Sequence, residues 1–226
     1  MKIKNIINLL LPPIITRIIK KYIVSNRQST FIESTGEKNE NWYDKSYKKN
    51  KHFHNEYYKS PYYFIWTVII DRVIYNGGKL PYILELGSGT GQLAHYLQNS
   101  GVKDYTGVDF SKIGIEYSKE RCTGFNFINN DFFKVQFNNI QYDTVICCET
   151  LEHLENDIDL IKKIKPGARF IGTVPDFPWL SHVRYFNSEE EVLNRYSDLF
   201  QKINVNCFLN SNKNRFYLID GIIRNN

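Results

Sequence analysis

Short apolar runs alternate with amphipathic segments along the chain from residue 81 onward. Runs that predict strands cover residues 82–86, 105–109, 125–129, 142–148, 168–174, 203–209 and 215–223. Helical patterns fall between them, over residues 92–98, 111–120, 157–164 and 188–199. Strands that alternate with helices predict βαβ units and a mainly parallel sheet. The polar turn 210–214 joins the last two runs and predicts an antiparallel hairpin at the end of that sheet.

The preceding part of the chain has a different pattern and divides into two zones. Residues 1–28 are apolar and basic, whereas residues 29–80 are polar at first and then strongly aromatic. The stretch 60–74 has too many large side chains for one helix face, so we expect some of them to roof a pocket. We therefore predict an N-terminal segment (1–28), an aromatic-rich helical lid (29–80) and a catalytic domain (81–226).

The charge of the chain is concentrated at its start. The net charge is +5, but residues 1–28 hold six of the 29 basic residues and none of the 24 acidic ones, which leaves 23 against 24 for the rest. A nearly neutral body lacks the positive field of a protein that grips many phosphates, so a nucleic-acid partner is disfavoured.

The basic start also suggests where the protein works. Pro12-Pro13 and Arg17 would interrupt a membrane-spanning helix, and no small-residue cleavage site follows. Short amphipathic helices with basic flanks are typical of peripheral contact with an anionic membrane, although packing on the catalytic domain or on a partner is the alternative. Four cysteines without a C-x-x-C pair favour a reducing compartment. We expect a cytoplasmic protein, with contact at the inner membrane surface through residues 1–28.

A glycine-rich loop follows the first predicted strand. It reads Glu85-Leu86-Gly87-Ser88-Gly89-Thr90-Gly91 and lies at a strand end, where open α/β sheets bind ligands. Dinucleotide-binding loops prefer G-x-G-x-x-G with a helix end for the pyrophosphate, whereas this loop is G-x-G-x-G preceded by an acid. The pattern disfavours a nicotinamide-dependent dehydrogenase and suits a cofactor that carries an ammonium group.

Further acids follow the next two strands. Asp109, with Phe110 after it, comes 18 residues beyond Gly91 and could accept both hydroxyls of a ribose. Asp131, with Phe132 after it, could accept an adenine amino proton while an aromatic ring covers the base. Each acid could instead cap a helix or turn, but their joint register favours a nucleoside site.

These motifs closely resemble those of the class I S-adenosylmethionine-dependent methyltransferases. ILELGSGTGQLA, YTGVDFS and NNDFF are similar to the first three motifs of that superfamily, and YDTVICCETLEHL to the fourth. The resemblance covers residues 81–226 and implies a Rossmann-like seven-stranded sheet in the order 3-2-1-4-5-7-6. It implies S-adenosylmethionine as cofactor, bound by Glu85, Gly87, Ser88, Gly89, Gly91, Asp109, Phe110, Asp131, Phe132 and Glu149.

The segment Glu149-Thr150-Leu151-Glu152-His153 bears on the chemistry. It is similar to the E-x-x-E-H of ubiquinone-pathway O-methyltransferases and of small-RNA 3′-end methyltransferases. The resemblance implies either that His153 and Glu152 act as a general base or that they hold a divalent metal ion together with Glu149 and His182. We favour the base, and a helix start without catalytic role is the third alternative.

The acceptor is indicated only by looser features. SPYYFIWTVI and SHVRYFNSEEEV are similar to segments of methyltransferases from bacterial surface-polysaccharide clusters, which implies O-methylation of a sugar, a glycan precursor or a related small molecule. The alternatives are an RNA-end or quinone-type O-methyltransferase, or a cofactor-binding interaction module without catalysis. His52 and His54 lie in a lysine-rich run and are expected in solvent, and His95 on a helix face.

Overall fold

A computed structural model of the protein describes residues 36–74 and 80–225. Seven strands form a single sheet in the order β3-β2-β1-β4-β5-β7-β6, which confirms the predicted order. The strands are β1 Tyr82–Leu86, β2 Asp104–Asp109, β3 Asn126–Asn129, β4 Thr144–Cys148, β5 Arg169–Pro175, β6 Phe200–Leu209 and β7 Arg215–Ile223. The first five run parallel, and β7 is antiparallel to both β5 and β6. The predicted hairpin at residues 210–214 is confirmed by the β6–β7 pairing.

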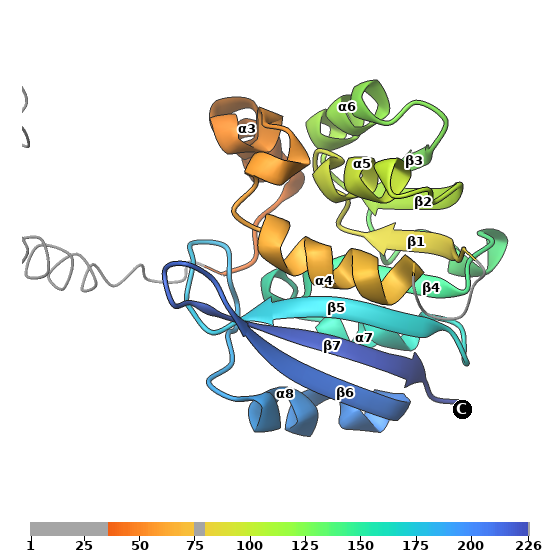
Figure 1. Ribbon diagram of the computed structural model, residues 1–226, viewed down its shortest axis with the longest axis vertical. Helices are drawn as coiled ribbons and strands as arrows, with labels where there is room; N and C mark the ends of the chain where they lie inside the picture. The colour runs from red at the N-terminus through yellow and green to blue at the C-terminus, as the bar shows by residue number, and fades with distance from the viewer. Residues whose placement is uncertain (1–35, 75–79, 226) are drawn as a thin grey trace, which may run out of the picture. The chain divides into compact units, whose positions relative to one another are not determined.

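Helices cover both faces of this sheet (Figure 1). They are α3 Glu40–Lys49, α4 Tyr63–Ile74, α5 Gln92–Asn99, α6 Lys112–Arg121, α7 Asp157–Lys162 and α8 Glu189–Tyr196. Short 3₁₀ turns lie between them: η1 Lys51–His54, η2 Tyr57–Lys59, η3 Phe137–Asn139, η4 Leu151–His153 and η5 Ser197–Leu199.

Two apolar cores lie on opposite faces of the sheet, because successive side chains of a strand point to opposite sides. Ile83 of β1 belongs to one core, together with apolar residues of α4 and α5. Its neighbour Leu84 belongs to the other core, together with residues of α7 and α8. Strands buried on both faces read as continuous apolar runs, which explains why the sequence revealed them so clearly.

Helix α4 lies against the sheet, although it falls within the zone predicted as a lid. Its Ile65 and Ile69 are fully buried in the core that contains Ile83. The aromatic zone is therefore divided between two tasks. The last two turns of α4 build the core, while α3, η1 and the start of α4 reach the cavity described below.

Side-chain caps fix the starts of α3, α6 and α8. The Asn39 side chain accepts the Trp42 N–H at the start of α3, and the Ser111 hydroxyl accepts the Gly114 N–H at the start of α6. Ser188 likewise accepts the Glu191 N–H at the start of α8. The Glu191 carboxylate, however, accepts the N–H of Asn187 and not that of Ser188, so this is a displaced capping box.

The predicted membrane-contact segment, residues 1–28, lies outside the described residues, and its role stays a prediction. Over residues 36–74 and 80–225, no helix combines the length and the apolar character that crossing a bilayer requires.

Candidate active site

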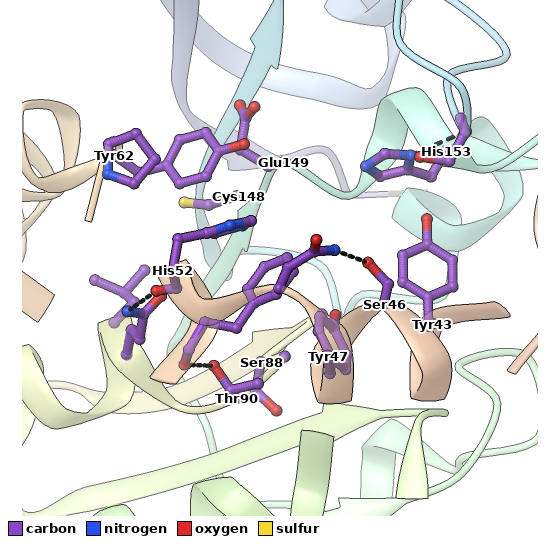
Figure 2. A pocket seen from close by; sticks show the side chains of 18 of the residues that line it. Tyr43, Ser46, Tyr47, His52, Tyr62, Ser88, Thr90, Cys148, Glu149 and His153 are labelled. Atoms are coloured by element: carbon purple, nitrogen blue, oxygen red, sulfur yellow. Dashed lines mark hydrogen bonds between the residues drawn. The ribbon is translucent and has the colours of Figure 1, made fainter. Parts of the chain in front are cut away.

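A cavity of about 670 Å³ opens at the carboxyl ends of β1, β4 and β5 (Figure 2). Its size is typical of a site for a small molecule or cofactor. Its walls come from the glycine-rich loop after β1, from α3, η1 and the start of α4, from the end of β4, and from residues 177–182 after β5. The lining side chains are mostly aromatic or polar, and no lysine or arginine occurs among the described ones.

The glycine-rich loop forms one wall. Gly87 has a φ of +85°, and a Cβ on it would lie 2.1 Å from the Thr150 hydroxyl oxygen, so no larger residue fits there. Gly89 has a φ of +52°, and a Cβ on it would lie 3.3 Å from the Tyr47 hydroxyl of α3. Gly91 is the N-cap of α5 and does not line the cavity.

Ser88, between two of these glycines, does line the cavity. Its hydroxyl oxygen is buried and has no hydrogen-bond partner among the described residues. A buried polar atom in this state is expected to bond to a ligand or to water. The loop thus offers close backbone approach to a bound molecule, with the buried Ser88 hydroxyl behind it.

Two carboxyl groups face the cavity from strand ends, the buried Glu85 and the half-buried Glu149. Burial raises the pKa of Glu85 to about 8, against the lowering effect of the hydrogen bond that Tyr105 donates to it at 2.5 Å. Burial raises the pKa of Glu149 to about 7, and the Thr173 hydroxyl donates to this carboxylate at 3.0 Å. Because no basic side chain compensates them, these groups favour a cationic part of a ligand.

Asp109 lies beneath the glycine-rich loop and does not line the cavity. Its carboxylate accepts the N–H groups of Gly89 and Ser111, both at 2.8 Å. Burial raises its pKa to about 6, although both hydrogen bonds act in the opposite direction. In this structure Asp109 fastens the loop to the start of α6, and its contact with a ribose stays a prediction.

The other residues predicted to contact a nucleoside also lie off the cavity. Phe110 packs against Tyr43, with 5.2 Å between the ring centroids. Asp131 accepts the Phe133 N–H at 2.9 Å, and Phe132 is 6% exposed within the core. Phe132 therefore does not present a ring face to the cavity. The sequence alone did not distinguish the buried Phe132 from the exposed Phe133.

Helix α3 closes the cavity above the glycine-rich loop. Asp44 accepts hydrogen bonds from the Ser111 hydroxyl at 2.5 Å and from the Ile113 N–H at 3.2 Å, which fastens α3 to the start of α6. Tyr43 and Tyr47, one turn apart on α3, line the cavity (Figure 2). The sequence identified these rings only as part of an aromatic block, and it gave no signal for the neighbouring Ser46 and Asn50, which also line the cavity.

His153 and His182 meet at the far wall, with 4.8 Å between their ring centroids. The Nδ1 atom of His153 lies 2.9 Å from the Ser181 carbonyl, and that of His182 lies 3.0 Å from the Phe177 carbonyl. Since a carbonyl only accepts, Nδ1 carries the proton in both rings. Burial lowers the pKa of His153 to about 3 and that of His182 to about 4, so both rings are neutral at physiological pH.

Glu152 lies behind His153 and is fully buried. Its Oε1 is 3.8 Å from Nε2 of His153, and neither carboxyl oxygen has a hydrogen-bond partner among the described residues. Burial raises the pKa of Glu152 well above its ordinary range, so the contact joins a protonated carboxyl group to a neutral imidazole and is not an ion pair.

The potential ligand atoms of Glu152, His153 and His182 all lie within 4.8 Å of one another. Two imidazoles and one carboxylate are a donor set that suits a divalent ion, and each ring has the backbone hydrogen bond typical of a ligating histidine. Glu149, the fourth predicted ligand, is engaged with Thr173 and does not belong to this group. The negative charge of Glu152 beside the two histidines can thus be neutralised by a proton or by a bound cation.

The remaining histidines differ in their distance from this site. His52, expected in solvent, lines the cavity from η1, and its carbonyl accepts the Gln92 amide at 3.0 Å. His52 is exposed, as expected, although the backbone of η1 is held against α5. His54 is exposed and bonds to the Tyr47 carbonyl at 2.9 Å. His95 lies on the face of α5 and is 3.6 Å from Glu56.

Known proteins with similar sequences include methyltransferases. Residues 83–166 match the family described as the methyltransferase domain. A ubiquinone biosynthesis O-methyltransferase of Rickettsia canadensis (strain McKiel) is 32% identical over 117 residues, which are 47% of this chain and 49% of that protein. The chain covers 41–49% of the length of the first curated relatives it matches.

Solved structures with the same fold cover nearly all of the described chain. The magnesium protoporphyrin IX methyltransferase ChlM from Synechocystis PCC 6803, solved with bound SAH, has a TM-score of 0.64 at 15% identity and covers 82% of this chain and 97% of its own. The cyclase SpnF has a TM-score of 0.65 at 11% identity, with coverage of 86% and 100%. Because one of these proteins is a cyclase, the fold alone does not determine the reaction.

Proposed function

We propose that this chain, whose residues 83–166 match the methyltransferase domain family, is a class I S-adenosylmethionine-dependent methyltransferase that methylates a hydroxyl group of an uncharged small molecule. The observation that carries the proposal is the single cavity wall where an unused serine hydroxyl and a buried acid adjoin the glycine-rich loop. His153 on the opposite wall, with Glu152 behind it, supplies a place for the acceptor.

The residues of the loop fit the cofactor. Glu85 would face its ammonium group, Ser88 would donate to its carboxylate, and Gly89 leaves room where a side chain would meet both the ligand and Tyr47. When bound, S-adenosylmethionine supplies an activated methyl group whose bonding electrons return to the sulfur. The contribution of the protein is to align an acceptor oxygen behind that methyl group and to exclude water.

The character of the cavity narrows the acceptor. No lysine or arginine occurs among the described lining residues, so a phosphate or carboxylate on the acceptor would meet two acids and no counter-charge. Trp42, Trp66 and Trp179 supply aromatic faces instead. Such faces stack on the apolar side of a sugar ring as well as on a planar ring. We propose a sugar or glycan precursor without phosphate near the methylated hydroxyl.

A phenol is the second candidate. It is supported by the sequence match to ubiquinone biosynthesis O-methyltransferases, which extends over about half of each chain. The aromatic walls suit a phenol ring equally well. The two candidates differ in acidity, because a phenol hydroxyl loses its proton far more easily than a sugar hydroxyl does and depends less on a base.

His153 is our candidate for the proton acceptor. With its proton on Nδ1, the neutral ring keeps a lone pair on Nε2. The acceptor hydroxyl would transfer its proton to Nε2 as the oxygen takes the methyl group. Glu152, which is protonated in the resting site, would stabilise the resulting imidazolium from 3.8 Å at the higher pH where it ionises. Glu152 does not line the cavity, so it acts through His153. A divalent ion held by Glu152, His153 and His182 would take over this role by polarising the hydroxyl, and chelation distinguishes the two.

The direct test is methyl transfer from isotopically labelled S-adenosylmethionine. The purified protein would be assayed with neutral sugars, with phenols, and with a phosphorylated counterpart of each active compound. We expect transfer to a neutral acceptor and at least a tenfold lower kcat/KM for its phosphorylated counterpart, since about 1.4 kcal/mol of lost binding corresponds to tenfold. Equal use of both would refute the uncharged acceptor. Cofactor binding without transfer to any compound would favour an interaction module.

A further inference from the structure

The cavity wall that contains Ser181 and His182 belongs to a long irregular segment, residues 176–188, between β5 and α8. A segment without regular backbone pairing needs other contacts to hold two functional side chains in register. One contact is the Val183 N–H, which donates to the Glu152 carbonyl at 2.8 Å. The Phe186 N–H donates to the Pro175 carbonyl at 3.0 Å, and the side chain of Arg184 adds several contacts to η4.

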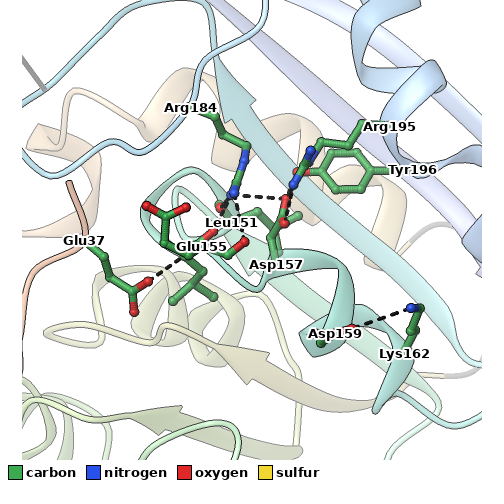
Figure 3. Close-up of polar contacts among 10 residues, drawn as sticks. Glu37, Leu151, Glu155, Asp157, Asp159, Lys162, Arg184, Arg195 and Tyr196 are labelled. Atoms are coloured by element: carbon green, nitrogen blue, oxygen red, sulfur yellow. Dashed lines mark hydrogen bonds and ion pairs between the residues drawn. The ribbon is translucent and has the colours of Figure 1, made fainter.

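Arg184 crosses from this segment to the turn η4, which holds Glu152 and His153 (Figure 3). Its guanidinium group donates to the Leu151 carbonyl at 2.6 Å, to the Leu154 carbonyl, and to the Glu155 carbonyl at 3.1 Å. The Leu151 carbonyl also accepts the Leu154 N–H at 3.3 Å, whereas the Leu154 and Glu155 carbonyls lie beyond the end of the turn, where helical partners are lacking. The planar fork of an arginine suits several carbonyls at once, which a lysine cannot match.

Asp157 holds the guanidinium group in place from the other side. Its carboxylate is 1% exposed and lies 3.1 Å from Nη1 of Arg184. Arg195 donates to both oxygens of the same carboxylate, at 2.8 and 2.7 Å, and the Tyr196 hydroxyl donates at 2.7 Å. This cluster, Asp157 with Arg184, Arg195 and Tyr196, therefore anchors the irregular segment to α7 and α8 (Figure 3).

The consequence reaches the two histidines. The hydrogen bond from His153 to the Ser181 carbonyl spans η4 and the irregular segment, so its length depends on how the two are joined. Arg184 does not line the cavity. It belongs to the segment that holds His182 and binds the turn that holds His153. In the proposed reaction, that hydrogen bond keeps Nε2 of His153 available as the proton acceptor.

We propose that Arg184 is a positioning residue that fixes His153 in its Nδ1–H form by locking residues 176–188 onto η4. The role of His153 as proton acceptor rests on the proposed function, whereas the effect of Arg184 on the position of the His153 ring does not. Arg195 provides a matched control, because it binds the same carboxylate and makes its side-chain hydrogen bonds to Asp157, not to the carbonyls of η4.

The test compares Arg184→Gln, Arg184→Lys and Arg195→Gln with the unmodified protein. Two-bond ¹⁵N–¹H NMR of the five histidine rings reports which ring nitrogen holds the proton. We expect the Nδ1–H signal of His153 to be lost in Arg184→Gln, weakened in Arg184→Lys, and unchanged in Arg195→Gln. An unchanged His153 signal in a folded Arg184→Gln would overturn the proposal. If Arg184→Gln does not fold, the comparison of Arg184→Lys with Arg195→Gln decides in the same way.

Turnover gives the second readout. Displacement of a catalytic group by about 1 Å can cost up to roughly 100-fold in rate. We expect kcat of Arg184→Gln to fall about 10- to 100-fold while the Kd for S-adenosylhomocysteine stays within about twofold, with partial recovery in Arg184→Lys. A fall of equal size in Arg195→Gln would mean that Arg184 merely stabilises the fold. If the unmodified protein transfers no methyl group, the proposed function fails, and the NMR comparison still decides the position of His153.

Discussion

Glu85 allows a test of the electrostatics of the cavity wall formed by the glycine-rich loop. Its carboxyl group is 3% exposed and faces no lysine or arginine among the described cavity residues. Replacement by glutamine keeps the shape and the ability to accept the Tyr105 hydroxyl, but removes the charge. Burial raises the pKa of Glu85 from 4.5 to about 8. A difference of about 3.5 pKa units corresponds to about 5 kcal/mol, which is an upper bound on the destabilisation that ionisation of Glu85 causes.

The sign follows from proton linkage. A group with a higher pKa in the folded chain than in the unfolded one binds its proton more tightly when folded, so its contribution to stability is present below pH 4.5 and is lost as pH rises toward 8. The free energy of unfolding of the ligand-free protein should therefore fall more steeply over this range than that of Glu85→Gln. Urea unfolding followed by circular dichroism at pH 5, 7 and 9 measures the difference.

We expect Glu85→Gln to be more stable than the unmodified protein at pH 9, by up to about 5 kcal/mol, and the two to converge toward pH 5. Glu120→Gln, at an exposed position of α6, is the control and should leave the difference near zero at each pH. A stability difference between Glu85→Gln and the unmodified protein that does not change with pH would refute the reasoning, because it would mean that Glu85 has no raised pKa.

Other predictions concern the loop, the base and the N-terminus. Gly89→Val should abolish S-adenosylhomocysteine binding in calorimetry while circular dichroism stays unchanged, because its side chain would fill the space beneath Tyr47; normal affinity would contradict the loop assignment. His153→Ala and Glu152→Gln should each slow transfer by about 10²–10⁴-fold without weakening cofactor binding. Loss of activity on chelation, restored by a divalent ion, would instead favour the metal. A chain that starts at Ser29 should no longer sediment with anionic vesicles, and equal pelleting of both chains would remove the membrane contact.

The pH dependence of transfer gives a further prediction. Burial lowers the pKa of His153 to about 3, so the ring is already neutral throughout the ordinary histidine range. We therefore expect no inflection of kcat near pH 6.5 and a rise only where Glu152 ionises, above its ordinary range. An inflection near pH 6.5 that disappears in His153→Ala would show that the ring is far less buried during catalysis.

The sheet could be predicted because its signals are local. Strands such as β1 and β5 are buried on both faces, which produces apolar runs that a single sequence displays. The glycine-rich loop was equally visible, since Gly87 has a backbone conformation and a contact with Thr150 that admit only glycine. The order of the strands, by contrast, came from resemblance to a family and not from any local pattern.

The lid and the far wall could not be predicted in the same way. Whether Ser46 or Ser181 faces the cavity depends on how α3 and residues 176–188 pack against distant elements, and hydroxyl residues leave no pattern in the sequence. His52 is exposed, as its lysine-rich surroundings predict, but its place beside the cavity depends on the hydrogen bond between Gln92 and the backbone of η1. Tertiary contacts of this kind determine which side chains line the acceptor part of the cavity. The residues of the glycine-rich loop were therefore easier to predict.

The central claim is that Glu85 and the glycine-rich loop bind S-adenosylmethionine or its product. Titration calorimetry with S-adenosylhomocysteine at pH 7, in two buffers of different ionisation enthalpy, measures both affinity and proton exchange. With a pKa of about 8, Glu85 is mostly protonated at pH 7 and must ionise to pair with the ammonium group. We predict tight binding with release of nearly one proton, and weaker binding without proton release in Glu85→Gln. Absence of binding to the unmodified protein would contradict the account, and binding with identical proton exchange in both proteins would contradict the role of Glu85.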